Sequence, residues 1–122
     1  MILFDSNILI YSSEPARIDA RAFIAQTIEG AASHISLVEV LGFSKMSARM
    51  HGELEKVFEQ LVLLPITEEI IYQAVKLRRS RSMSLGDSII ASTALVHSIP
   101  LVTNNEKDFS WIDGLSLINP IK

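Results

Sequence analysis

Short apolar runs without polar alternation recur along this chain and constrain its fold more than any other feature. The first, Met1–Phe4, is closed by the polar residues Asp5, Ser6 and Asn7. A run of this kind is typical of a strand that is buried on both faces, as in a parallel sheet. Because helix-like segments separate the runs, the sequence predicts an α/β fold with a central, largely parallel sheet.

Four further strands are predicted, at His34–Ser36, Leu61–Leu64, Pro100–Thr103 and Leu115–Ile118. Helices are expected over residues 17–29, with Gly30 as the C-terminal end, over residues 36–45, from an N-cap at Thr67 onward, and over residues 86–97. In such sheets the ligand crevice lies beyond the carboxyl ends of the strands. That edge is therefore where we look for a site.

The size and composition of the chain fit one domain over residues 1–122, because this length suffices for one hydrophobic core. The absence of cysteine excludes disulfides, zinc–thiolate sites and a cysteine nucleophile, and it suits a reducing cytoplasm. Apolar runs such as Leu61–Ile66 are far shorter than the roughly 20 residues of a membrane-spanning helix. We expect a cytoplasmic protein without a membrane segment or a signal peptide.

Three acidic residues fall where the chain is expected to leave the sheet or to enter an apolar helix: Asp5, Glu39 and Asp87. Each has a structural alternative, which is a turn at Asp5, a capping box formed by Ser36 and Glu39, and a favourable helix dipole at Asp87. Three acids at one sheet edge would nevertheless repel one another unless a cation compensates them. With oxygen ligands alone, and no ligand-spaced His or Cys, the favoured ion is Mg²⁺ or Mn²⁺.

A basic run precedes Asp87, with four cations within six residues: Lys76, Arg78, Arg79 and Arg81. The chain as a whole has a net charge of −3, so it offers a polyanion no general attraction. The run is either a solvated helix end that favours the negative pole of the helix dipole, or a set of phosphate contacts beside the acidic centre.

The order and spacing of four segments resemble the PIN domain, and most closely the compact VapC-type toxins of prokaryotic toxin–antitoxin pairs. These segments are Ile2–Ile10, Ser36–Glu39, Gly86–Ala91 and Leu101–Asn105. The similarity extends to Leu64–Thr67 and to Ile118–Pro120. It implies a PIN-like three-layer fold, with a central, mostly parallel sheet of four to five strands flanked by helices.

The same resemblance implies an endoribonuclease that depends on Mg²⁺ or Mn²⁺ and hydrolyses RNA phosphodiester bonds with metal-activated water. Its metal-binding and catalytic positions match Asp5, Glu39, Asp87 and Asn105. Many family members carry Asp at the fourth position, so either Asn105 or Asp108 completes the set. Ser6 or Thr103 is expected to bind a carboxylate or phosphate oxygen. The RNA-contacting residues expected from the basic run are Arg78, Arg79 and Arg81.

As partners, the resemblance implies a small antitoxin protein and a second copy of the chain in a homodimer. A competing interpretation is a PIN-like module that binds RNA or protein without cutting it, which Asn105 favours if the acidic centre holds metal weakly. A phosphoryl-accepting receiver domain is the third interpretation. Such domains carry an acidic pair after the first strand, whereas Asp5 stands alone.

Overall fold

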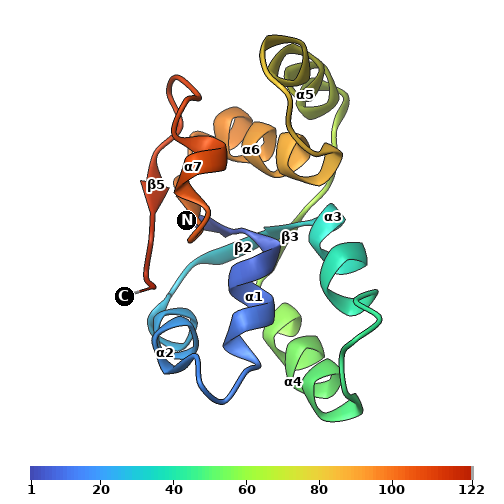
Figure 1. Ribbon diagram of the computed structural model, residues 1–122, viewed down its shortest axis with the longest axis vertical. Helices are drawn as coiled ribbons and strands as arrows, with labels where there is room; N and C mark the ends of the chain where they lie inside the picture. The colour runs from blue at the N-terminus through green and yellow to red at the C-terminus, as the bar shows by residue number, and fades with distance from the viewer. Residues whose placement is uncertain (122) are drawn as a thin grey trace.

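A computed structural model describes residues 1–121 and shows a central sheet between two layers of helices (Figure 1). Within these residues the sheet has five strands, all parallel, in the order β3-β2-β1-β4-β5. The strands are β1 (Ile2–Phe4), β2 (Gly30–Ser33), β3 (Val62–Leu64), β4 (Leu101–Val102) and β5 (Leu117–Ile118). The predicted fold class is confirmed.

Helices cover both faces of this sheet, with α5, α6 and α7 on one side and α1, α2 and α4 on the other (Figure 1). Their bounds are α1 (Ser6–Ser12), α2 (Ile18–Gln26), α3 (His34–Ser36), α4 (Ala48–Glu59), α5 (Glu68–Ser80), α6 (Leu85–His97) and α7 (Glu106–Phe109). A π-helical segment, η1 (Leu37–Leu41), follows α3. None of the helices in the described part of the chain is long and apolar enough to cross a membrane.

Neighbouring residues of the central strands face two separate hydrophobic cores. The core shared with α5 and α6 contains Leu3, Ala31 and Leu101. The core shared with α1 and α4 contains Phe4, Ala32 and Val102. Because successive strand residues point to opposite faces, burial of both faces requires consecutive apolar residues. This arrangement explains the unbroken apolar runs in the sequence.

The helix predicted over residues 17–29 is shorter in the structure, and Gly30 is not its end. Helix α2 stops at Gln26, and Gly30 opens β2, where it pairs with Ile2. Glycine is required there because a Cβ on Gly30 would lie 2.7 Å from the Phe4 ring and 2.8 Å from the Leu61 side chain. Ile28, whose spacing supported the longer helix, is 97% exposed.

Of the two predictions for residues 34–45, the strand is wrong, and the helix is correct only as far as Leu41. His34–Ser36 is helical and not a strand, because Ser33 Oγ accepts a hydrogen bond from the Ile35 N–H (3.1 Å) and caps a helix there. The helix expected over residues 36–45 is replaced by η1, which ends at Leu41. π-Helical turns are rare and occur often at functional sites, and this one carries Glu39.

Helices α1, α4 and α7 have no counterpart among the predicted elements. Asp5–Asn7 is a junction between β1 and α1, and not an isolated turn. Helix α4 begins after Ser47, whose Oγ accepts a hydrogen bond from the Met50 N–H (3.2 Å). The N-cap predicted at Thr67 is confirmed, because its Oγ1 accepts a hydrogen bond from the Ile70 N–H (3.3 Å).

Candidate active site

The three predicted acids lie together beyond the carboxyl ends of the central strands. Asp5 directly follows β1, Glu39 lies on η1 beyond the end of β2, and Asp87 lies in the first turn of α6. All three line one cavity of about 210 Å³, together with Ser6 and Phe43. Strand order thus brings together residues that are far apart in the sequence.

Asp5 is the most buried of these acids, with 3% of its surface exposed. The Thr103 hydroxyl, which follows the neighbouring strand β4, donates a hydrogen bond to Asp5 Oδ2 (2.8 Å). The pKa of Asp5 is raised to about 6, mainly by burial, and the negative charges of Asp87 and Glu39 also raise it against the lowering effect of the Thr103 hydrogen bond. A nearby cation would relieve the cost of ionising such a group.

Glu39 is oriented by a serine from another segment. Ser6 Oγ donates a hydrogen bond to Glu39 Oε1 (2.7 Å) and lies 2.9 Å from Ser36 Oγ. Ser36 makes no side-chain cap hydrogen bond, so the capping-box alternative for Ser36 and Glu39 is wrong. The Glu39 carboxylate faces the acidic cavity instead.

Gly86 allows Glu39 to lie against the first turn of α6, beside Asp87. A Cβ placed on Gly86 would collide with Glu39 Oε2. Gly86 was not among the predicted site residues. The available signal was a glycine inside a helix, which costs about 1 kcal/mol relative to alanine and calls for a packing reason.

Asp87 links the first cavity to a second one of about 300 Å³, which also touches α7. The pKa of Asp87 is raised by burial and, in addition, by the charges of Asp108 and Glu39, while a hydrogen bond with Ser84 lowers it. Asp108 lines the second cavity with Asp87 and therefore belongs to the same acidic centre.

The two candidates for the fourth ligand occupy different places. Asp108 shares a cavity with Asp87, whereas Asn105 lines neither of the two cavities. The Asn105 backbone N–H donates a hydrogen bond to Thr103 Oγ1 (3.0 Å), and Thr103 in turn holds Asp5. Asn105 is thus connected to the acidic centre through Thr103.

The donor chemistry of this centre fits a hard divalent cation. It offers carboxylate oxygens, which are the donors that Mg²⁺ and Mn²⁺ prefer, and no histidine or cysteine lines either cavity. Within residues 1–121, no ion pair involves Asp5, Glu39 or Asp87. In the same part of the chain, no three His, Asp or Glu side chains form a ready-made metal site. The carboxylates would therefore have to converge to hold an ion.

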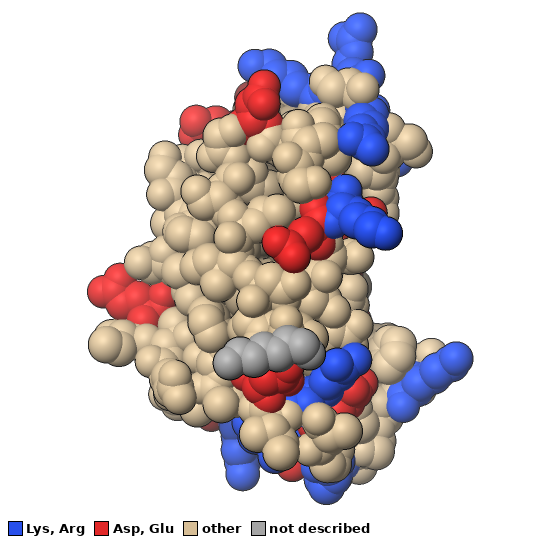
Figure 2. Space-filling view, turned by 60° about the vertical axis from the view of Figure 1, so that its left-hand side comes forward, with Lys and Arg blue, Asp and Glu red and all other residues tan. Residues whose placement is uncertain are grey.

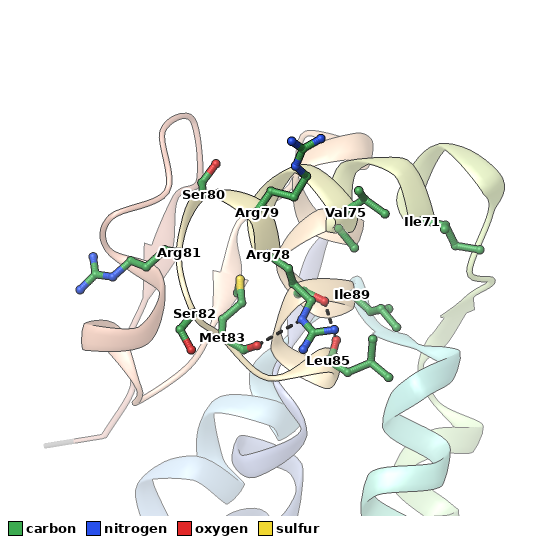
Figure 3. Close-up of a pocket in the computed structure, with 12 residues that line it drawn as sticks. Ile71, Val75, Arg78, Arg79, Ser80, Arg81, Ser82, Met83, Leu85 and Ile89 are labelled. Atoms are coloured by element: carbon green, nitrogen blue, oxygen red, sulfur yellow. Dashed lines mark hydrogen bonds between the residues drawn. The ribbon is translucent and has the colours of Figure 1, made fainter.

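The basic run divides between two places. Arg81 follows the end of α5, and its guanidinium lies over the Trp111 ring, 5.6 Å from the centroid, in the cavity that contains Asp87. Arg78 and Arg79 line a groove of about 920 Å³ between α5 and α6, which Arg81 also lines (Figure 3). On the face shown in Figure 2, basic side chains lie at both ends of the molecule, and at the end where α5 lies they are accompanied by acidic ones.

The sequence profile of the PIN domain matches residues 2–115. The chain belongs to the PIN domain family. The resemblance found in the sequence is therefore confirmed, and it covers nearly the whole chain.

This PIN domain is similar in structure to chains of solved toxin–antitoxin complexes. One, from a toxin–antitoxin complex of Klebsiella pneumoniae, is 31% identical, with 100% of this chain and 99% of that chain covered and a TM-score of 0.82. Another, from VapBC2 of Rickettsia felis bound to a promoter DNA fragment, is 25% identical, with 98% of each chain covered and a TM-score of 0.78. A third, from DNA-bound VapBC of Salmonella typhimurium, shares the fold at 20% identity, with 98% of this chain and 99% of that chain covered and a TM-score of 0.83. A search of curated proteins gives no match.

Proposed function

We propose that this PIN domain is the toxin of a VapBC-type toxin–antitoxin pair and acts as an endoribonuclease that depends on Mg²⁺ or Mn²⁺. The observation that carries the proposal is the single cavity lined by Asp5, Glu39 and Asp87, with no lysine or arginine among its lining residues. The negative charges of Asp87 and Glu39 raise the pKa of Asp5, and the charge of Glu39 also raises the pKa of Asp87. Membership of a family that consists generally of nucleases supports the activity. Similarity at 31% identity to a chain of a toxin–antitoxin complex supports the toxin role and an antitoxin partner.

In this proposal Asp5, Glu39 and Asp87 hold the ion, with Asp108 as a fourth carboxylate. When bound, the ion activates water and offsets the negative charge that develops on the phosphate during hydrolysis. The Thr103 and Ser6 hydroxyls each engage one oxygen, of Asp5 and Glu39 respectively, so both carboxylates are oriented before a ligand arrives. No side chain is assigned as the nucleophile.

RNA cleavage by the purified protein tests the proposal. The wild type should cut single-stranded RNA with Mg²⁺ or Mn²⁺ and be inactive in EDTA. Asp5→Asn, Glu39→Gln and Asp87→Asn should each abolish cleavage and weaken Mn²⁺ binding measured by calorimetry, while the circular dichroism spectrum stays unchanged. A variant that cuts like the wild type at saturating Mg²⁺ would remove its residue from the ligand set.

A non-catalytic PIN-like module that binds RNA or protein is the second candidate function. The observation that favours it is the absence, within residues 1–121, of a ready-made cluster of three metal ligands. Asn105, which stands where many family members carry Asp, weakens the metal site further. Wild-type protein that binds RNA and cuts it with neither ion would establish this second function.

A second copy of the chain is the partner we propose for the exposed face of α5. This face presents three large apolar side chains to solvent, namely Ile71 (48% exposed), Tyr72 (62%) and Val75 (49%). Figure 3 shows Ile71 and Val75 on α5 together with Leu85 and Ile89 on α6, around one groove. Contiguous exposed apolar side chains of this kind mark sites of protein–protein contact.

The charges of α5 make this face complementary to itself. The helix begins with an acidic pair, Glu68 and Glu69, and ends with a basic pair, Arg78 and Arg79. Two copies of α5 packed antiparallel about a two-fold axis would bring each acidic pair beside the basic pair of the other copy. A two-fold interface uses the same patch on both subunits and therefore needs this self-complementarity.

A further inference from the structure

The cavity on the far side of Asp87 contains side chains that the proposed hydrolysis does not use. It has a volume of about 300 Å³ and includes two cations, Arg81 and Lys107, and the indole of Trp111. Since Asp87 lines both this cavity and the one that contains Asp5, the two adjoin at Asp87. A strand of nucleic acid with a phosphate at the acidic centre would therefore continue into this second cavity.

Two segments hold the walls of the cavity in place. The Arg81 backbone N–H donates a hydrogen bond to the Leu77 carbonyl (3.2 Å), although residue 81 itself is extended. The Trp111 Nε1–H donates a hydrogen bond to the Asp108 carbonyl (2.9 Å), and its ring also packs against the core beneath α6. The indole is thus fixed in orientation, and the Arg81 guanidinium lies over its face as a cation–π pair.

These groups have the chemistry that recognises an unpaired nucleotide. Aromatic rings and guanidinium planes stack on bases, and Arg and Lys contact phosphate oxygens. Stacking needs a base that is not already stacked within a duplex, so a single strand fits the cavity better than a double helix. Lys107 and Arg81 line the same cavity as Asp87 and Asp108, so a phosphate in the cavity would meet cations as well as carboxylates.

We infer that this cavity binds the nucleotide next to the cleaved phosphate of a single-stranded RNA, with its base on Trp111 and Arg81 and its phosphate on Lys107 and Arg81. The inference rests on the proposed nuclease function and adds Lys107 and Trp111 to the residues that position the substrate. It also selects Arg81 from the basic run as the arginine that serves the acidic centre.

Trp111 is the only tryptophan of the chain, so its fluorescence reports on this cavity alone. The experiment titrates a short single-stranded RNA into the wild-type protein in EDTA, where no cleavage interferes. Binding is measured in parallel by the anisotropy of fluorescein-labelled RNA. We expect a saturable change in Trp111 emission with the same midpoint as the anisotropy change.

Variants then assign the individual roles, with anisotropy as the readout. Trp111→Ala should weaken RNA binding by roughly tenfold or more, because base–aromatic stacking is lost, whereas Trp111→Phe should keep most of the affinity. The slope of log affinity against log salt is negative, and Arg81→Ala and Lys107→Ala should each make it shallower by about 0.7. Lys56→Ala is the matched control, because Lys56 lies on α4 and lines neither cavity; its salt slope should equal that of the wild type.

Several outcomes would overturn the inference. RNA that binds by anisotropy without changing Trp111 emission would place it elsewhere, as would a Lys56→Ala variant that loses as much affinity as Lys107→Ala. If Trp111→Ala fails to fold in thermal melts, Trp111→Phe and Lys107→Ala still decide the question. Cleavage without a Trp111 response would refute this subsite and leave the nuclease proposal intact. A Trp111 response without cleavage would refute the nuclease and retain the RNA site.

Discussion

Removing the charge of Asp5 should make the metal-free protein more stable near neutral pH. Asp5 is almost wholly buried, and its pKa is about 6 in the folded protein against 3.8 for the ordinary side chain. Between these two pH values the folded protein holds a proton on Asp5 that the unfolded chain has lost. Stability falls with rising pH wherever the folded state binds more protons, so the metal-free protein should lose stability from about pH 4 to about pH 6.

The size of this effect follows from the difference between the two pKa values. A difference of about two pKa units corresponds to about 3 kcal/mol, at 1.36 kcal/mol per unit. In Asp5→Asn the amide oxygen can still accept the Thr103 hydrogen bond, while the charge is gone. At about pH 7.5 in EDTA, the free energy of unfolding of the variant should exceed that of the wild type by up to about 3 kcal/mol. Below about pH 4 the difference should vanish.

Urea unfolding in EDTA, followed by circular dichroism at several pH values, measures both predictions. Asp113→Asn is the matched control, because Asp113 is exposed and lines neither cavity of the acidic centre. Adding Mg²⁺ should then stabilise the wild type and leave Asp5→Asn unchanged, because ligand binding to the folded state alone raises stability.

The opposite sign would refute the reasoning. Asp5 precedes the first turn of α1, where a negative charge can stabilise a helix through its dipole, although Asp5 makes no side-chain cap hydrogen bond there. If Asp5→Asn is less stable than the wild type near neutral pH, this helix interaction outweighs the cost of burial. Asp5 would then be a residue that stabilises α1, and not a metal ligand whose charge is unfavourable without the ion.

Three further predictions concern the geometry of the site and the dimer. Gly86→Ala should reduce RNA cleavage at least several-fold, because the added Cβ displaces the Glu39 carboxylate. Gly52→Ala is the control, because a Cβ at Gly52 meets nothing within 4 Å. This control should keep full activity in the same assay and gain up to about 1 kcal/mol of stability in thermal melts. Thr103→Val removes the hydrogen bond that lowers the pKa of Asp5, so the acid limb of the pH–rate profile should move to higher pH; an unmoved limb would show that Asp5 does not set it. Reversing the charges of either the acidic pair or the basic pair of α5 should give monomers in size-exclusion chromatography with light scattering, and mixing the two variants should restore a dimer. A wild type that is itself monomeric would refute the α5 interface.

Strands β1, β3, β4 and β5 and two long helices were predictable because their signals are local, whereas β2 was missed. Residues buried on both sides of a parallel sheet must be apolar, so strand β1 is visible as an unbroken run at Ile2–Phe4. The Thr67 cap and the apolar positions Ile70, Ala74 and Leu77 mark α5 in the same way. Helix α4 has comparable signals in its cap at Ser47 and its buried Leu54 and Phe58, although it was not among the predicted elements.

Other elements depend on contacts that no local pattern encodes. Nothing in the sequence distinguishes the π-helical turn at Leu37–Leu41 from an ordinary helix, because the difference is one residue per turn. The junction at Asp5 resembles a polar turn until the packing of Ile8 and Leu9 against the sheet makes it the start of α1. In both places tertiary packing overrides the local preference.

The three acids of the site were predictable from strand order, since the carboxyl ends of parallel strands share one edge. Ser6 and Thr103 were also expected to bind a carboxylate or phosphate oxygen, but the pairing of each hydroxyl with its carboxylate was not predictable. Which hydroxyl bonds to which carboxylate depends on the path of the chain. In the structure the Ser6 hydroxyl donates a hydrogen bond to Glu39, and the Thr103 hydroxyl donates one to Asp5. The contribution of Asp108 depends on α7, where Phe109 is fully buried in the core and Asp108 is left on the cavity side.

The basic run shows why charges that are adjacent in a sequence need not form one patch. Helix α5 ends at Ser80, so Arg78 and Arg79 remain on the helix whereas Arg81 belongs to an extended segment that leads toward α6. Successive residues of a helix point about 100° apart, and the end of the helix adds a change of direction. Of the basic run, only Arg81 reaches the cavity that contains Asp87. The other cation in that cavity is Lys107, which comes from α7 and not from the run. A protein with a net charge of −3 thus places two cations from distant segments beside its acidic centre, which is where a phosphate would otherwise be repelled most strongly.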